Sequence, residues 1–205
     1  MRSARRNTDK FNRIIQAAVK IFARKGFYNA KIAEIAREAQ VADGTIYLYF
    51  QNKDDILINL FEVKMDLILQ NMREKLALEK NPLKKVQIFA LQHLKMMENS
   101  KELSEVIQVE MRQSSKFMKE YKNEKFFEYL RIFSDIVEQG QIEGVFGPDI
   151  IPGIAKRAFF GALDEMSRYW VLSAKKKYDV ETAAKEISRL FLEGMCMSPE
   201  GGLSS

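Results

Sequence analysis

The chain has 205 residues, of which 46% are hydrophobic and 30% charged, an ordinary composition for a folded protein with a hydrophobic core. One cysteine, Cys196, and one histidine, His93, exclude an internal disulfide and argue against a cysteine- or histidine-based metal site or a histidine-dependent catalytic triad. No apolar h-region follows the basic N-terminus and no apolar run approaches the ~20 residues of a membrane span, so we expect a soluble, cytoplasmic protein without a membrane partner.

Positive charge is concentrated near the N-terminus. Residues 1–55 hold 11 Lys and Arg against 6 Asp and Glu, whereas residues 56–205 hold 22 of each. The whole net charge of +5 therefore lies in the first quarter of the chain. A basic module beside a neutral one favours a polyanion such as DNA as the partner of the first module. On charge alone, chance unevenness is an equally good explanation.

Apolar residues recur at three- and four-residue spacing along most of the chain, which predicts an all-α protein. The first helix is expected to begin at Thr8, a suitable N-cap, and to end at Gly26. A second short helix is expected over 32–39. Asp43 is then expected to cap a third short helix over 44–50.

The fourth predicted helix is long. Asn52 is its expected N-cap, Asp55 completes a box-like cap, and the helix ends near residue 79, before the Asn81-Pro82 break. Residues 144–148 are expected to form a loop, and His93 to lie on the polar face of its helix. Further helices are expected at roughly 83–98, 101–113, 115–140, 151–174 and 180–196.

Residues 32–50 have the dimensions of a helix-turn-helix, in which one short helix braces a second that enters the major groove of DNA. Its small core is expected to consist of Ile14, Ala18, Phe22, Ile35, Ala36, Val41, Ile46 and Phe50. The residues left outside carry hydroxyl, ammonium and backbone N–H groups, which suit phosphates and base edges. The candidate DNA-contacting residues are Lys31, Asp43, Gly44, Thr45, Tyr47, Tyr49 and Lys53. The basic stretch 2–6 is expected to follow the DNA backbone or to enter the minor groove.

Two stretches resemble a known family. The run from Val41 to Lys53, VADGTIYLYFQNK, and the helix before it, IAEIA from Ile32, are similar to the signature of the TetR family of transcriptional repressors. The resemblance implies a homodimer that binds a palindromic double-stranded DNA operator, with Lys53 on a phosphate. It implies an N-terminal three-helix helix-turn-helix DNA-binding domain over residues 1–52. A C-terminal helical effector-binding and dimerisation domain follows over 53–198, and 199–205 form a flexible tail.

The sequence departs from the family pattern at two positions. Ala30 stands where the family usually has Ser or Thr as the cap of the second helix, so either Asn29 caps instead or roughly 1 kcal/mol is lost. Gln40 stands where the family usually has Gly. A positive φ at that position costs a Gln on the order of 1 kcal/mol. Neither departure touches the DNA-facing residues.

The family resemblance also implies that the last two helices, about 151–174 and 180–196, form a four-helix bundle with a partner subunit. Gly161 and Ala162 allow close helix approach. A stripe on the last helix suits the same interface, although an intramolecular core explains it equally well; its members are Ile187, Leu190, Phe191 and Gly194.

The predicted effector-binding body is rich in Met and Phe, which fill irregular apolar space and adapt to flexible ligands, as they also fill an ordinary core. Arg112 suits an anionic head group or a pair with Glu110, and the acids at 164 and 165 suit pairing with Arg168. Several stretches, among them EMRQS from Glu110 and GALDE from Gly161, are similar to the FadR branch of the TetR family, which implies long-chain acyl-CoA as the effector. The candidate effector-binding residues are Met65, Leu69, Met72, Met111, Arg112, Phe160 and Asp164.

Three other functions stay open. An enzyme is disfavoured because the sequence offers no nucleophile with a base, no metal cluster and no Gly-rich phosphate loop, so no catalytic residue, metal ligand or cofactor is predicted. A membrane-surface protein would use the basic N-terminus on anionic lipids. A regulator of the same family that answers a different apolar ligand, such as a drug or another lipid, is the nearest alternative.

Overall fold

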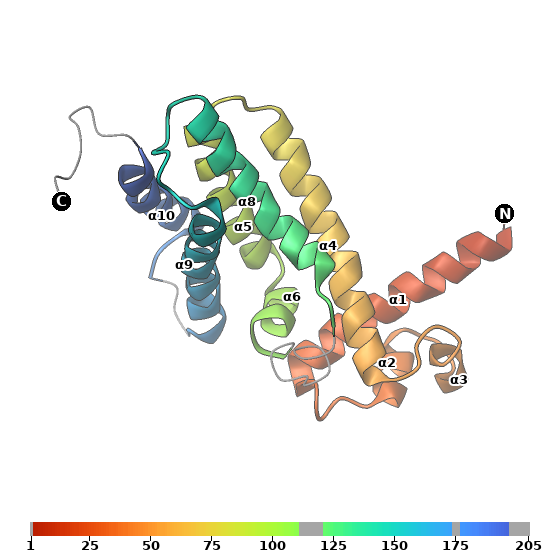
Figure 1. The fold of residues 1–205 in the computed structure, drawn as a ribbon. Coiled ribbons are helices and arrows are strands. Elements are labelled where there is room, and N and C mark those ends of the chain that lie inside the picture. The colour runs from red at the N-terminus through yellow and green to blue at the C-terminus, as the bar shows by residue number, and fades with distance from the viewer. Residues whose placement is uncertain (1, 111–120, 174–176, 197–205) are drawn as a thin grey trace. The chain divides into compact units, whose positions relative to one another are not determined.

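The computed structural model describes residues 2–110, 121–173 and 177–196 (Figure 1), so the candidates Met111 and Arg112 lie outside the described residues. The described helices are α1 (Arg2–Lys25), α2 (Ile32–Glu38), α3 (Asp43–Ile46), α4 (Lys53–Ala77), α5 (Pro82–Asn99), α6 (Lys101–Glu105), the π-helix η1 (Val106–Glu110), α8 (Glu124–Ile142), α9 (Pro152–Leu172) and α10 (Val180–Met195). The predicted all-α class is confirmed. None of the described helices is both long and apolar enough to cross a membrane.

The chain divides into two compact units. The first contains residues up to Asp66 together with Ser100–Asn123, and the second contains Leu67–Asn99 and the chain from Glu124 onward. Helix α4 is continuous across the division, with its first half in one unit and its second half in the other. Each unit has its own buried residues.

The first unit is organised around α1, which packs against α2 and also contacts α6 and η1, while α2 packs against α3. The predicted small core is buried, with Ile14, Ile35 and Ile46 all fully inaccessible to solvent. Val41 is an exception, since it is half-exposed at the turn between α2 and α3. This core fixes the two short helices against the longer α1.

Three predicted helix boundaries are wrong. Helix α1 begins at Arg2 rather than at Thr8, because the Arg, Ser and Ala residues before Thr8 contain no helix breaker. Helix α3 ends at Ile46, with Ala42 as its N-cap, and the chain continues to Phe50 through hydrogen-bonded turns. Helix α8 begins at Glu124, and the preceding Asn123 has a φ of +31°, which an α-helix does not allow.

Other local signals are confirmed. Gly26 ends α1 with a φ of +79°, and the side-chain oxygen of Asn52 accepts a 2.8 Å hydrogen bond from the Asp55 amide at the start of α4. Gln40 has a φ of +55°, so the strained backbone expected at this turn is present. Of the two alternatives for the start of α2, the cap by Asn29 is not formed: α2 has no side-chain cap hydrogen bond, and the Asn29 amide donates to the carbonyl of Lys25 (3.2 Å).

In the second unit, α5 packs against α8, α9 and α10, and α9 contacts both α8 and α10. Aromatic rings fill the space between these helices, and Phe133 stacks on Phe159 with 4.3 Å between ring centroids. The predicted loop at 144–148 is present, and Phe146 turns back from it into the core with no exposed surface. Phe146 also forms an isolated antiparallel bridge with Cys196.

Candidate functional site

The helix-turn-helix presents an exposed surface along α3 and the turns that follow it. Asp43 and Gly44 are exposed at its start, and Thr45 is half-exposed. Tyr47 exposes 60% of its surface and Leu48 81%, although both belong to a segment whose opposite side is fully buried. The structure therefore brings most of the predicted DNA-contacting residues onto one surface and adds Leu48, which the sequence analysis did not select.

Tyr49 is less exposed than Tyr47 and Leu48, which precede it. Its ring lies 6.3 Å from that of Phe11, which in turn stacks on Phe50 at 5.3 Å between centroids. Phe50 is 2% exposed and anchors the end of the segment in the core. The packing leaves Tyr49 half-exposed and orients it through α1.

Lys53 is the predicted DNA contact whose surroundings differ most from expectation. Its ammonium donates to the carbonyl oxygens of Tyr28 (2.9 Å) and Ala30 (3.1 Å) and lies 4.7 Å from the centroid of the Phe27 ring. Burial lowers the pKa of Lys53, an effect that the neighbouring Asp54 carboxylate opposes. The ammonium is thus engaged by the connection between α1 and α2.

The start of α2 is fixed by ionic contacts. Lys31 occupies the N-cap position but has no side-chain acceptor, and its backbone amide donates instead to Glu34 Oε2 (3.2 Å). The other carboxylate oxygen of Glu34 pairs with Lys25 at the end of α1. Lys31 itself is exposed, which leaves its ammonium accessible.

The candidate effector residues are distributed over both units. Met65 is buried in the first unit, while Leu69 and Met72 are buried in the second, all three on α4. Phe160 and Asp164 are half-buried on α9. The expected pairing of the α9 acids is confirmed for Glu165, which binds Arg168 through two hydrogen bonds of 2.9 and 2.8 Å.

His93 contradicts the sequence analysis. It is 3% exposed rather than on a polar face, its Nδ1 lies 2.7 Å from the hydroxyl of Tyr129, and its ring is nearly perpendicular to that of Phe160, with 5.7 Å between centroids. Burial lowers the pKa of His93 to about 4, against the opposing effect of Asp164, so the imidazole is neutral at neutral pH. Among the described residues, Nε2 has no hydrogen-bond partner. A lone histidine carries no periodic signal, so only its tertiary neighbours reveal this polar pair in an aromatic interior.

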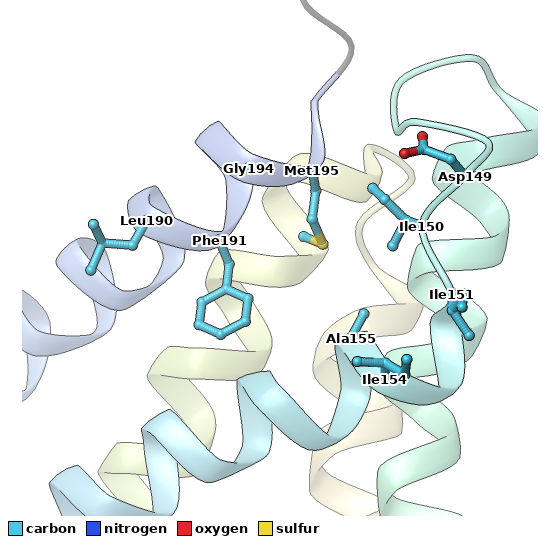
Figure 2. Close-up of a pocket in the computed structure, with 9 residues that line it drawn as sticks. All are labelled: Asp149, Ile150, Ile151, Ile154, Ala155, Leu190, Phe191, Gly194 and Met195. Atoms are coloured by element: carbon cyan, nitrogen blue, oxygen red, sulfur yellow. The ribbon is translucent and has the colours of Figure 1, made fainter. Parts of the chain in front are cut away.

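Helices α9 and α10 each expose apolar side chains among charged ones. Ile154 and Leu190 expose 63% and 60% of their surfaces, and Gly161 is exposed in the middle of α9. Between the start of α9 and the end of α10 lies an open groove of about 470 Å³, into which Phe191 and Met195 point (Figure 2). Apolar side chains and small residues on one face suit close packing against another helix surface.

Comparison with known proteins accounts for both parts of the chain. Residues 14–60 match the family of bacterial regulatory proteins called the tetR family, and residues 61–194 match the C-terminal region of YsiA-like proteins. The chain belongs to the TetR family. Members of this family are transcriptional regulators rather than enzymes.

One curated relative and two solved structures are similar to this protein over nearly the whole chain. The fatty acid metabolism regulator of Bacillus subtilis (strain 168) is 33% identical over 186 residues, which cover 91% of this chain and 95% of that protein. The crystal structure of the regulator FadR from Bacillus subtilis in complex with stearoyl-CoA matches with a TM-score of 0.84 and 33% identity, covering 90% of this chain and 98% of that one. The fatty acid degradation regulator FadR of Bacillus halodurans matches with a TM-score of 0.83, 34% identity and the same coverage of both chains.

Proposed function

We propose that this TetR-family regulator represses genes of fatty-acid metabolism as a homodimer and leaves its DNA operator when a long-chain acyl-CoA binds. The observation that carries the proposal is the similarity to FadR of Bacillus subtilis, whose structure contains stearoyl-CoA, over 90% of this chain. The similarity includes the helices beyond the DNA-binding region, where the effector would bind.

The surface along α3 would contact the operator. Tyr47, Tyr49 and Thr45 offer hydroxyls to phosphates and base edges, the exposed backbone at Asp43 and Gly44 allows close approach, and the exposed Lys31 supplies a cation. The net positive charge of this region favours association with the polyanion. Lys53 adds positive charge at the border of the surface.

The faces of α9 and α10 that expose apolar side chains would form the dimer interface. A second copy presents the same exposed side chains and would fill the groove beside Phe191 and Met195. Leu190→Asp is expected to produce a monomer, measured by light scattering after size-exclusion chromatography. The matched control is Leu78→Asp, because Leu78 is 88% exposed and lies outside this face. A dimeric Leu190→Asp variant would refute this interface.

The effector would act by shifting a population between two states of the dimer. Helix α4 is continuous from the residue after Asn52 to Ala77, and it carries Met65, Leu69 and Met72 on its buried side. A dimer reads two half-sites at a fixed separation, so a displacement of α4 would prevent simultaneous docking. The ligand must bind the DNA-incompetent state more tightly than the competent one.

The effector test is a calorimetric titration of delipidated protein with stearoyl-CoA, stearate and CoA. We expect micromolar or tighter binding of stearoyl-CoA alone, near one molecule per subunit, and release of bound DNA at the same concentrations. Phe160→Ala should weaken binding roughly tenfold, because it removes an aromatic contact of the ligand. Phe127→Ala is the matched control, since Phe127 is 53% exposed. Absence of binding by all three compounds would leave a regulator with a different apolar effector.

A further inference from the structure

The contacts of Lys53 suggest a role that differs from phosphate binding. An ammonium has three N–H donors, and two of them are directed at the carbonyls of Tyr28 and Ala30. The Phe27 ring lies on another side of the same group. Lys53 is half-buried, whereas Lys31 is exposed.

The two carbonyls belong to the connection between α1 and α2, where the chain lacks the usual capping side chain. Neither Ala30 nor Lys31 offers a side-chain acceptor to the first amides of α2. The start of α2 is fixed on one side by Glu34, which accepts from the Lys31 amide and pairs with Lys25 of α1. On the other side it is fixed by Lys53, the first residue of α4, which donates to the carbonyl of Ala30.

We infer that Lys53 is a positioning residue whose ammonium ties the first turn of α4 to the segment Tyr28–Ala30 and thereby makes the helix-turn-helix follow any movement of α4. This inference deepens the proposed release mechanism and rests on it. A displacement of α4 separates the half-sites of a dimer only if α2 and α3 move with it. The hydrogen bonds of Lys53 supply that connection at the point where α4 begins, within a single compact unit.

The decisive variant is Lys53→Met, which keeps an apolar stem beside Phe27 and removes the N–H donors. Lys31→Met is the matched control, because it removes the same charge from an exposed residue of the same surface. Lys53→Arg is the conservative variant and should restore part of the wild-type behaviour. Circular dichroism establishes that each variant is folded before the comparison.

The first measurement is amide hydrogen exchange in the free, full-length protein. Loss of two hydrogen bonds to a charged group should accelerate exchange at residues 28–32 roughly tenfold or more in Lys53→Met, with little change in Lys31→Met. Unchanged exchange in Lys53→Met would overturn the inference. The exchange measurement needs no DNA, so it tests the contact between Lys53 and residues 28–30 by itself. If the wild-type protein selected no duplex, the proposed DNA-binding function would be refuted, and the exchange result would still stand.

The second measurement uses a palindromic duplex selected by the wild-type protein from a random library, together with versions whose half-sites are one base pair closer or farther apart. Lys53→Met should bind duplexes with altered half-site spacing better than the wild-type protein does, because α2 and α3 are no longer fixed to α4. The slope of log affinity against log salt should stay at the wild-type value. Lys31→Met should lower the magnitude of this slope by about 0.9 for each phosphate that the lysine neutralises. If Lys53→Met lowered the slope in the same way and kept the wild-type spacing preference, Lys53 would be a phosphate ligand and the inference would be wrong.

Discussion

Replacement of Gly140 by alanine should destabilise the second unit strongly. A Cβ atom at this position would lie 2.0 Å from Cδ2 and 2.4 Å from Cε2 of Phe146, whereas non-bonded carbons prefer about 3.5 Å or more. The ring cannot move aside into solvent, because Phe146 is completely buried. The backbone is also fixed, since the amides of Val145 and Phe146 both donate to the carbonyl of Gly140 at 2.8 and 3.0 Å.

The loss of unfolding free energy can be bounded from two known costs. Overpacking a core costs about 1–3 kcal/mol, and expelling a buried phenylalanine ring costs about 3–5 kcal/mol. We expect Gly140→Ala to approach the upper range, about 3–5 kcal/mol, which lowers the melting temperature by roughly 10 °C. The ring is the anchor of the loop that leads into α9, so the loss should extend to the proposed dimer face.

The assay is urea-induced unfolding at one fixed protein concentration, because dimerisation would otherwise change the apparent stability. Gly153→Ala is the control, since a Cβ there meets nothing within 4 Å. Phe146→Ala and the double variant complete a cycle, and the double variant should be about as stable as Phe146→Ala because the added methyl group occupies vacated space. A Gly140→Ala protein within about 1 kcal/mol of wild type, or strict additivity in the cycle, would refute this reasoning.

Three further predictions concern single residues. Gln40→Gly should stabilise the protein by up to about 1 kcal/mol in the same unfolding assay, because it relieves a φ of +55°. The buried His93, with its pKa lowered from 6.5 to about 4, stays neutral in the folded state while the unfolded state takes up a proton. Stability should therefore fall by up to about 3 kcal/mol as the pH drops from about 7 to 4, and His93→Gln should lose less over the same range. Leu48 is 81% exposed on the surface along α3 and should contact a thymine methyl group of the operator. Replacement of thymine by uracil at one symmetric operator position should therefore weaken DNA binding by the wild-type protein but not by Leu48→Ala.

Most of the helix-turn-helix, apart from the bounds of α3 and the exposure of Val41, could be predicted because its determinants are local. Gly26 ends α1 because its own backbone adopts a positive φ. Asn52 caps α4 by accepting a hydrogen bond from the amide of Asp55, three residues later. The core around Ile35 and Ile46 follows from a short apolar pattern. The start of α1 could not be predicted, although it too is local. Thr8 is a good cap by type, but the residues before it favour a helix too, and propensity alone does not choose between them.

The environment of the lone histidine could not be predicted, because it depends on contacts between distant parts of the chain. His93 lies 36 residues from Tyr129 and 67 from Phe160, and its burial follows from how α5, α8 and α9 pack. The pattern along α5 alone allows either a polar or a buried position. The same limit applies to the candidate effector residues, whose selection by residue type cannot separate ligand contacts from ordinary core.

The contacts of Lys53 within the chain could not be predicted from its position in the motif. The motif places a cation at the start of α4, next to the DNA-facing surface, and position alone therefore favours a phosphate contact. The structure gives the same cation two carbonyls and an aromatic ring. Ala30 leaves the start of α2 without a side-chain cap, so the two carbonyl contacts of Lys53 are expected to matter for this segment. The missing cap and the contacts of Lys53 therefore concern the same segment before α2. In an Ala30→Thr background, Lys53→Met should reduce the preference for the native half-site spacing less than it does in the native sequence.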